Sequence, residues 1–245
     1  MSFLVVLQDL IRSIFTMFLN LHMTFPTNQI LIYGPAGAGK SSFINSVQAL
    51  TSNNSTRNSK WQQLLLPFVF VDTTGVEMSQ DMHMDDIKLA LRGHVPEGYT
   101  FKADSKLSDD SRLYVRSPTE NNKVHALLCV YPTDTMSQLK EKHRDKQQLW
   151  LCSPAGIPQA AILTKIDQAC PELRRNLQNV YKVPYLRNKV CFMFSKEVGI
   201  PMDCIFPVKN YHEEIDLDND IDMLILSTLK NVIDLGEDYI QKFHH

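Results

Sequence analysis

The sequence predicts an α/β fold in which an open, mostly parallel sheet is covered by helices on both faces. Short apolar, β-branched runs alternate along the chain with longer helical patterns, and this alternation is typical of parallel sheets. The runs are apolar nearly throughout, as expected for strands that are buried on both faces. The length of 245 residues is sufficient for one large domain with a full core.

The expected elements follow in a regular order. Apolar runs predict strands at 30–33, 64–72, 124–131, 159–164 and 204–208. Helical periodicity predicts helices at 42–50, 79–92, 135–151, 170–198 with a break near Pro184, and 219–243. Polar stretches at 51–60 and 102–123 predict exposed, irregular segments. In the helix at 79–92, the face expected to lie inside consists of Met82, Met84, Ile87, Ala90 and Leu91.

A glycine-rich motif follows the first predicted strand and opens the first predicted helix. Residues 34–41, GPAGAGKS, match the P-loop pattern G-x-x-x-x-G-K-[ST] in full. Glycines permit backbone conformations in which successive N–H groups converge on phosphate oxygens, and the helix adds its positive N-terminal end. The sequence therefore predicts a P-loop NTPase fold. The expected phosphate-binding residues of this loop are Gly34, Pro35, Ala36, Gly37, Ala38, Gly39, Lys40, Ser41 and Ser42.

A second motif, Asp72-Thr-Thr-Gly75, closes the next predicted strand. The pattern D-x-x-G is weak alone and gains weight from its place after a P-loop and its helix. Asp72 and the Ser41 hydroxyl are expected to hold Mg²⁺, and the Gly75 N–H to contact the γ-phosphate. The alternative is an ordinary turn in which Asp72 caps a helix.

Thr164-Lys-Ile-Asp167 closes the fourth predicted strand, at the place of a guanine-reading motif. The Asp167 carboxylate can accept hydrogen bonds from N1–H and N2–H of guanine, which adenine lacks, so GTP is favoured over ATP. Lys165 is expected to lie along the base, and Thr164 stands where many GTPases have Asn. Lys209 and Asn210, after the last predicted strand, are expected to complete the base-binding loop.

Two features of the sequence argue against efficient nucleotide hydrolysis but not against nucleotide binding. Val76 follows Gly75, where Ras-like proteins carry the Gln that orients the attacking water. Glu77 is the nearest polar residue. The interval from Lys40 to Asp72 is also short for a helix, a first switch loop and a further strand. The sequence therefore predicts nucleotide binding more firmly than turnover, and no catalytic residue is assigned.

The N-terminal residues 3–25 form an apolar segment that Asp9, Arg12 and other polar residues interrupt. A charged residue at the centre of a membrane span costs about 2.5–3.5 kcal/mol. A helix packed on the domain is therefore favoured, while a membrane-surface helix and a span or leader are the alternatives. The expected division is an N-terminal helix at 1–26 and a P-loop domain at 27–245.

Composition limits the partners and the compartment. A net charge of −2 without a dense Lys/Arg stripe argues against nucleic-acid binding. Five cysteines without a C-x-x-C pair, several of them in apolar runs, indicate reduced thiols and a cytoplasmic protein. The acidic run at 216–222 lacks the glycine and the final acid of a calcium loop, and is expected to begin the last helix instead.

Several stretches resemble the interferon-induced protein 44 family. They are the P-loop and its helix at 34–47, DTTG at 72–75, MDDI at 84–87, RGHVP at 92–96, LTKID at 163–167, GIPM at 199–202 and IFPVKNY at 205–211. The resemblance implies a cytoplasmic, interferon-inducible, GTPase-like protein of the antiviral response. Family members usually carry an N-terminal TLDc-type domain and a longer first switch, and this sequence matches neither.

The expected function is GTP·Mg²⁺ binding by a nucleotide-dependent switch or slow GTPase in innate immunity, with protein partners or self-association. Peripheral membrane contact through 3–25 is not favoured. The alternative is a non-catalytic interaction protein on a degenerate GTPase fold. A P-loop kinase would need an Arg-rich lid, and 101–123 offers only Arg112 and Arg116.

Overall fold

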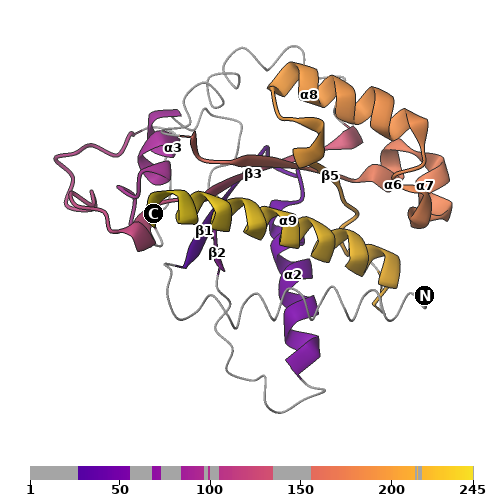
Figure 1. Ribbon diagram of the computed structural model, residues 1–245, viewed down its shortest axis with the longest axis horizontal. Helices are drawn as coiled ribbons and strands as arrows, with labels where there is room; N and C mark the ends of the chain where they lie inside the picture. The colour runs from indigo at the N-terminus through magenta and orange to yellow at the C-terminus, as the bar shows by residue number, and fades with distance from the viewer. Residues whose placement is uncertain are drawn as a thin grey trace.

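The computed structural model describes residues 27–55, 68–72, 84–96, 99, 105–134, 156–212, 214 and 217–244. Within these residues, five strands form one sheet of order β2-β1-β3-β4-β5, and every pair is parallel (Figure 1). The strands are β1 (Asn28–Tyr33), β2 (Phe68–Asp72), β3 (Ala126–Pro132), β4 (Gln159–Thr164) and β5 (Ile205–Pro207). The predicted α/β fold with a parallel sheet is thus confirmed.

Helices connect the strands. The α-helices are α2 (Lys40–Ser55), α3 (Met84–Leu91), α6 (Ile166–Ala169), α7 (Pro171–Arg175), α8 (Phe192–Val198) and α9 (Asn219–His244). The shorter 3₁₀ turns are η1 (Glu120–Asn122), η4 (Leu177–Asn179) and η6 (Met202–Cys204), and η5 (Tyr185–Cys191) is a π-helix. No described helix combines the length and the apolar character needed to cross a membrane.

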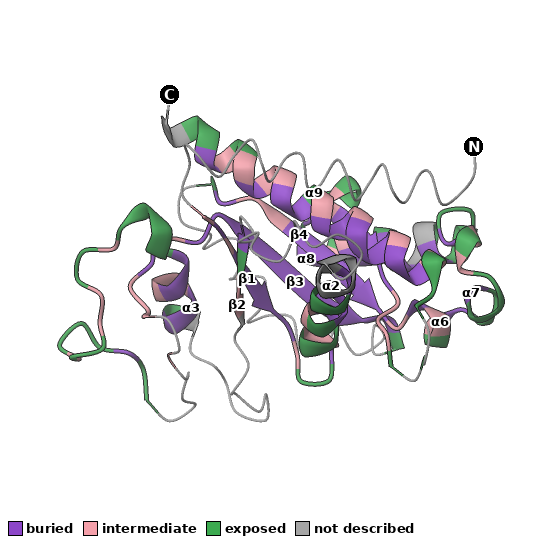
Figure 2. Ribbon diagram, turned by 90° about the horizontal axis from the view of Figure 1, so that it is seen from below, coloured by how far each residue is buried: buried purple, intermediate pink, exposed green. Residues whose placement is uncertain are grey.

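The sheet is covered on both faces, as predicted. Alternate side chains of a strand point to opposite faces. Ile30 and Ile32 of β1 accordingly pack in a cluster with residues of α2 and α9, whereas Leu31 and Tyr33 pack in a second cluster with residues of α3 and α8. Figure 1 shows α2 and α9 on one side of the sheet and α3 and α8 on the other. The strands β1, β3, β4 and β5 are almost entirely buried (Figure 2), whereas the edge strand β2 is partly exposed.

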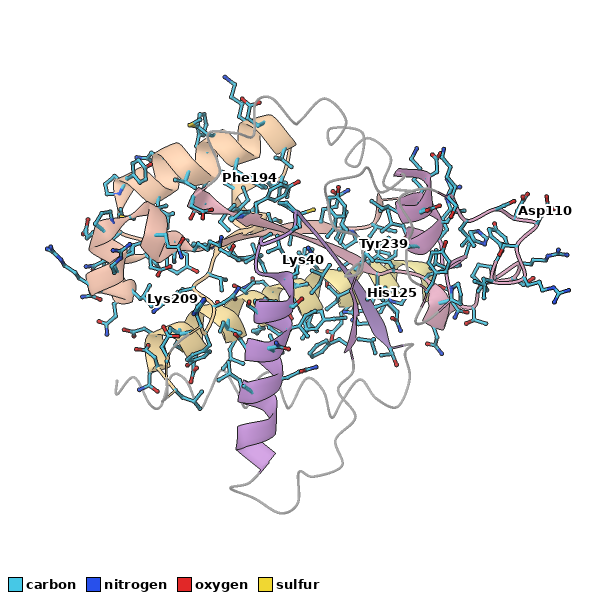
Figure 3. The ribbon with its side chains drawn as sticks, turned by 180° about the vertical axis from the view of Figure 1, so that it is seen from behind. Lys40, Asp110, His125, Phe194, Lys209 and Tyr239 are labelled. Carbon is cyan, nitrogen blue, oxygen red and sulfur yellow. The ribbon has the colours of Figure 1, made fainter. Side chains whose placement is uncertain are left out.

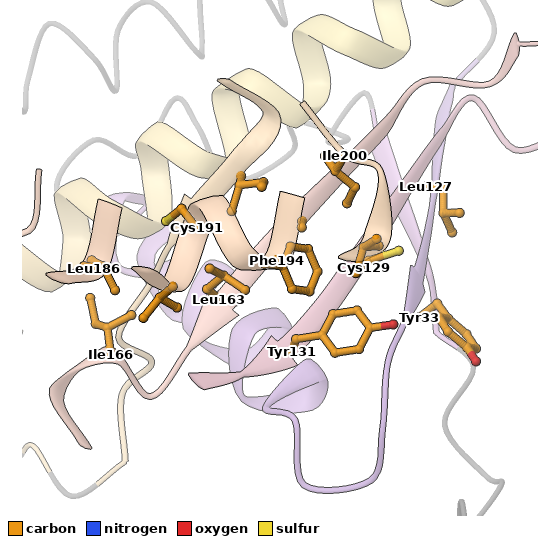
Figure 4. Packing of buried hydrophobic residues seen from close by; sticks show 14 of the residues in the cluster. Tyr33, Leu127, Cys129, Tyr131, Leu163, Ile166, Leu186, Cys191, Phe194 and Ile200 are labelled. Carbon is orange, nitrogen blue, oxygen red and sulfur yellow. The ribbon is translucent and has the colours of Figure 1, made fainter. Parts of the chain in front are cut away.

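The cluster beneath α8 is centred on aromatic and sulfur-containing side chains. Phe194 is fully buried and meets Tyr131 of β3 edge to face, with ring centroids 5.0 Å apart. Cys129 lies in the same cluster (Figure 4), and burial raises the pKa of its thiol to about 12. The described cysteines Cys129, Cys170, Cys191 and Cys204 are all free, and the first three are buried in the core.

Two predicted segments differ from the structure. Helix α2 continues to Ser55, so residues 51–55 are helical and not part of an exposed loop. Once a helix is nucleated, each further residue adds a hydrogen bond, and this outweighs the weak helix propensity of Thr, Ser and Asn. The helix predicted at 170–198 is divided into α7, η4, η5 and α8, and the break precedes Pro184.

Several predictions lie outside the described residues. They concern the N-terminal helix at 1–26, the start of the strand at 64–72, the contact from Gly75, the inner position of Met82, and the helix at 135–151. For the helix predicted at 79–92, the inner face is confirmed where its side chains are described, because Ile87, Ala90 and Leu91 are buried in α3.

The acidic run before α9 begins that helix, as predicted. The Asp218 carboxylate accepts hydrogen bonds from the backbone N–H groups of Asp220 (2.8 Å) and Ile221 (3.1 Å), which have no partner within the first turn. Farther along α9, a Cβ on Gly236 would lie 2.3 Å from side-chain atoms of Asn28. A glycine at this position therefore lets α9 approach the start of β1.

Glu237 on α9 gives the stability of the fold a pH dependence. Burial, followed by the carboxylates of Asp234 and Asp238, raises the pKa of Glu237 from 4.5 to about 7. Between these values the folded state holds a proton that the unfolded state has lost, so stability falls as pH rises through this window. We expect the wild-type Tm to decline from about pH 5 to about pH 8, and Glu237→Gln to remove part of the decline. Thermal melts at a series of pH values test this, and parallel curves for both proteins would contradict it.

Candidate functional site

The candidate site lies at the edge of the sheet where all the strands end. Because the strands are parallel, the segments after β1, β3, β4 and β5 emerge at this one edge. In the sheet, β2 lies on one side of β1 and β3 lies on the other. The order of the strands therefore reverses at β1, and the position between β1 and β3 is a topological switch point. Ligands of open α/β sheets bind at such points. The P-loop, residues 34–39, follows β1 at this position.

The backbone of the P-loop requires glycine at three positions. Gly37 and Gly39 have φ of 72° and 93°, in the left-handed region that favours glycine. Gly34 has no room for a side chain, since a Cβ would lie 2.1 Å from the backbone oxygen of Val130 in β3. The loop is therefore pressed against the neighbouring strand and curved into a conformation in which backbone N–H groups can face an anion.

Lys40, the first residue of α2, folds back over the P-loop. Its Nζ donates to the backbone oxygens of Gly34 (2.9 Å) and Pro35 (3.1 Å). The ammonium group is thus fixed at the mouth of the loop, at the end of α2 that lies next to the sheet (Figure 3). Ser41 and Ser42 follow in the first helical turn and are exposed. One positive side chain, two hydroxyls and the helix N-terminus are therefore presented together.

Two side chains from the predicted base-binding segments hold the P-loop from behind. The Thr164 hydroxyl donates to the backbone oxygen of Ala38 (2.5 Å), and the Asn210 amide donates to that of Gly39 (3.0 Å). Thr164 is almost fully buried at the end of β4. The threonine that stands where many GTPases have Asn thus makes a hydrogen bond to the loop through its hydroxyl. The structure brings the P-loop, the 164–167 segment and the 208–210 segment into one site.

Thr133, just after β3, is a site residue that the sequence reasoning missed. Its hydroxyl lies 2.8 Å from the backbone oxygens of both Thr164 and Lys165. Lys165 has φ of 57°, the positive value that residues other than glycine rarely adopt, and Thr133 supports it there. The next residue, Asp134, forms an ion pair with Lys165 (3.2 Å). The rule that parallel strands end at one edge would have placed both residues near Lys165.

The Asp167 carboxylate is available to a ligand. Asp167 lies in α6, is partly exposed, and makes no hydrogen bond within the described part of the chain. Asn210, which bonds to the P-loop, has a buried amide oxygen that also lacks a partner among the described residues. The 164–167 and 208–210 segments are both joined to the P-loop, and an open carboxylate on one with an unused acceptor on the other fits a ligand that donates hydrogen bonds.

Lys209 is held by an acid of its own loop. Its ammonium group lies 2.7 Å from Glu214, and Figure 3 labels the side chain. Burial alone would raise the pKa of Glu214, but hydrogen bonds from Lys209 and from backbone N–H groups outweigh it and lower the pKa to about 2. Tyr211 fixes the same segment, because its hydroxyl donates to the Asp222 carboxylate and accepts from the Asp218 N–H. Direct contact of Lys209 with a base stays a prediction.

The structure describes the backbone of both predicted metal ligands, Asp72 and Ser41. Asp72 is the last residue of β2 and pairs in register with Ile32 of β1, so its backbone lies near the P-loop strand. Ser41 is exposed at the start of α2, whereas Gly75 falls outside the described residues.

Comparison with known proteins gives one consistent result. No family model matches the chain. It is 28% identical to interferon-induced protein 44-like of Homo sapiens, over 87% of this chain and 52% of that protein. It is 25% identical to interferon-induced protein 44 of Mus musculus, over 87% of this chain and 56% of that protein. The chain is therefore similar to curated proteins of the interferon-induced protein 44 family. It spans about half the length of these curated relatives.

The stretches that resemble the interferon-induced protein 44 family have defined places in the structure. The IFPVKNY stretch contains β5 and continues with Asn210, which bonds to the P-loop, and Tyr211, which anchors the following segment. The MDDI stretch begins α3, where buried Asp86 accepts a hydrogen bond from the Leu107 N–H (3.0 Å). The first stretch therefore supports the candidate site, and the second holds the 105–108 segment against α3.

Proposed function

We propose that this protein binds GTP with Mg²⁺ and acts as a nucleotide-dependent switch or slow GTPase. The observation that carries the proposal is the pair of hydrogen bonds that join the P-loop to the two predicted base-binding segments, from Thr164 to Ala38 and from Asn210 to Gly39. A glycine-rich turn of purely structural origin has no need of a lysine over its mouth or of an open carboxylate on a segment that bonds to it. This combination suits a ligand with a phosphate chain at one end and hydrogen-bond donors at the other.

The residues present fit the proposed ligands. The backbone of 34–39 and the Lys40 ammonium would hold the phosphates, and the exposed Ser41 hydroxyl with Asp72 would hold Mg²⁺. Asp167 would accept the two N–H donors of guanine, flanked by Lys165. Bound Mg²⁺ would neutralise charge on the phosphate oxygens. The proposal assigns no catalytic residue, so binding and hydrolysis are to be measured separately.

The cellular setting follows from the relatives. The curated homologues carry the name interferon-induced protein 44 or interferon-induced protein 44-like. We propose by homology that this protein is induced by interferon and acts in the cytoplasm in the antiviral innate immune response, through protein partners or self-association.

The first test is a titration of the purified protein with fluorescent GTP and ATP analogues in Mg²⁺. We expect preferential binding of GTP, and loss of that preference in Asp167→Ala, with GTP affinity about tenfold lower or more because hydrogen bonds to a charged group are removed. Glu172→Ala, at an exposed acid on α7, is the matched control and should bind as the wild type does. Absence of binding by the folded wild type at millimolar nucleotide would leave a non-catalytic interaction protein.

A second substitution tests the orientation of the base. Xanthine carries a carbonyl at the position of the guanine amino group, so it needs a donor where guanine needs an acceptor. Asp167→Asn places an amide N–H there. We expect this variant to lose GTP and to gain xanthosine triphosphate. Unchanged GTP binding with no gain of xanthosine triphosphate would place Asp167 outside the base contact.

A further inference from the structure

A groove of about 510 Å³ lies outside the candidate site, between the turn that precedes η5 and the η6 turn. Tyr181, Phe192 and Met202 provide apolar walls, and Lys182 and Asn188 provide polar groups. Its volume lies within the range of about 300–1,000 Å³ that is usual for ligand-binding clefts. Phe192 of this groove belongs to α8, which lies on the opposite side of the sheet from α2 and α9 (Figure 1).

Large exposed apolar side chains are concentrated in the part of the chain that forms this groove. Among the described residues, eight large hydrophobic side chains are exposed, and five of them fall within 181–202. They are Tyr181, Tyr185, Phe192, Met193 and Met202, with Tyr181 60% and Phe192 54% exposed. Aromatic residues and methionine are enriched at protein interfaces, and clustered exposed apolar surface marks interaction sites.

The backbone beside the groove has an uncommon conformation. Tyr185–Cys191 form a π-helix that runs directly into α8. π-Helical turns are rare and occur frequently at functional sites. Leu186, Val190 and Cys191 anchor the segment in the core, whereas Asn188 lines the groove. The wide turn is thus fixed from below and shapes the surface above it.

The charge around the groove defines the chemistry of its occupant. The stretch from 171 to 204 has six Lys or Arg and three Asp or Glu, in a chain of net charge −2. Lys182 lines the groove, and Arg174, Arg175 and Lys196 are exposed nearby in sequence. A cleft with apolar walls and a lysine in its lining, on a stretch of net positive charge, is complementary to a segment with apolar side chains on one face and carboxylates on the other.

We propose that this groove binds an acidic amphipathic helix of a partner protein, with its apolar side chains between Tyr181, Phe192 and Met202 and its carboxylates toward Lys182. A helix laid into an apolar groove is a recurring mode of peptide recognition. A concave surface suits inserted side chains of a peptide, whereas a flat lipid surface would meet only its rim. The groove and the P-loop share no lining residue, so nucleotide binding and peptide binding can be tested independently.

The test measures fluorescence anisotropy of a labelled model peptide of about 16 residues, a length at which an isolated helix begins to form in water. The peptide has Leu and Phe on one face and Glu on the other. One control peptide has Lys in place of Glu, and another has Ser in place of Leu and Phe. We expect the wild type to bind the first peptide and neither control.

Variants of the protein assign the binding to the groove. Phe192→Ala is expected to weaken it about tenfold or more, as for an aromatic residue central to an interface. Lys182→Glu should lose the acidic peptide and gain the Lys-containing one. Leu113→Ala removes an equally exposed side chain elsewhere and should bind as the wild type does. Circular dichroism checks that each variant is folded.

Three results would overturn the proposal. They are no binding of the acidic peptide by the wild type, equal binding by Phe192→Ala, and binding to phosphatidylserine-containing vesicles that depends on Phe192 while the peptide does not bind. The last result would assign the groove residues to a lipid surface. None of these results bears on GTP binding.

Discussion

Phe194→Ala is expected to lower the free energy of unfolding by about 3–5 kcal/mol, the cost of truncating a fully buried phenylalanine. For a chain of this size the corresponding fall in Tm is roughly 6–20 °C. Phe194 has no exposed surface and meets Tyr131 edge to face, so the truncation removes both buried area and an aromatic pair. Its neighbours in Figure 4 include Leu163 and Cys129 from the central strands, and such surroundings relax only partly around the cavity that the truncation leaves.

Phe192→Ala is the matched control. Phe192 lies on the same helix two positions away and is 54% exposed, so its loss should change stability by less than about 1 kcal/mol. Chemical denaturation and thermal melts of the three proteins measure the difference. Similar losses in both variants would mean that α8 does not pack on the sheet through Phe194.

The packing of Phe194 also bears on the candidate site. Its partner Tyr131 lies in β3, and the chain then reaches Thr133, which supports Thr164 and Lys165. The ends of β3 and β4 are thus held from the α8 side by apolar packing and from the P-loop side by hydrogen bonds. A loosened α8 is therefore expected to reduce nucleotide binding as well as stability.

The strands were the most predictable part of the fold. Residues 159–164 were predicted as a strand and form β4 to the residue, because an apolar run between polar turns admits few other structures. The end of α2 was not predictable in this way. Its last residues are polar, and their helical state depends on the turns already formed before them. The π-helix at Tyr185–Cys191 has no sequence pattern that separates it from an α-helix.

The candidate site likewise has parts that the sequence predicted and parts that it did not. Motif and position predicted the P-loop, the strand end at Asp72 and the location of Asp167 shortly after β4. The contacts that join these segments were not predicted. The hydrogen bond from Asn210 to Gly39 links residues 171 positions apart, and it depends on the register of β3, β4 and β5. Register follows from packing across the whole sheet and cannot be obtained from either segment alone.

Lys40→Ala is expected to weaken binding of Mg²⁺·GTP by about 10- to 150-fold, which corresponds to about 1.5–3 kcal/mol for a charge-assisted hydrogen bond. The two backbone oxygens that hold the ammonium group, those of Gly34 and Pro35, fix its position before any nucleotide arrives. Little side-chain entropy is then lost on binding, so most of the attraction to the phosphates contributes to affinity. Arginine is not an adequate substitute, because its planar fork does not fit between two carbonyl oxygens that a compact ammonium group bridges.

Lys123→Ala is the matched control for this experiment, since Lys123 pairs with Glu120 on the surface before β3, at the opposite edge of the sheet from the P-loop. Titration of fluorescent GTP into wild type, Lys40→Ala and Lys123→Ala measures the three affinities, and thermal melts confirm that each protein is folded.

Lys40 also holds the two ends of its own loop together, so a second measurement is needed to separate phosphate contact from loop support. If Lys40 contacts the phosphates, the dependence of GTP affinity on salt concentration should be weaker in Lys40→Ala than in the wild type, because one charge interaction has been removed. An unchanged salt dependence with lowered affinity would show that the lysine acts through the loop, and an unchanged affinity would place the nucleotide elsewhere.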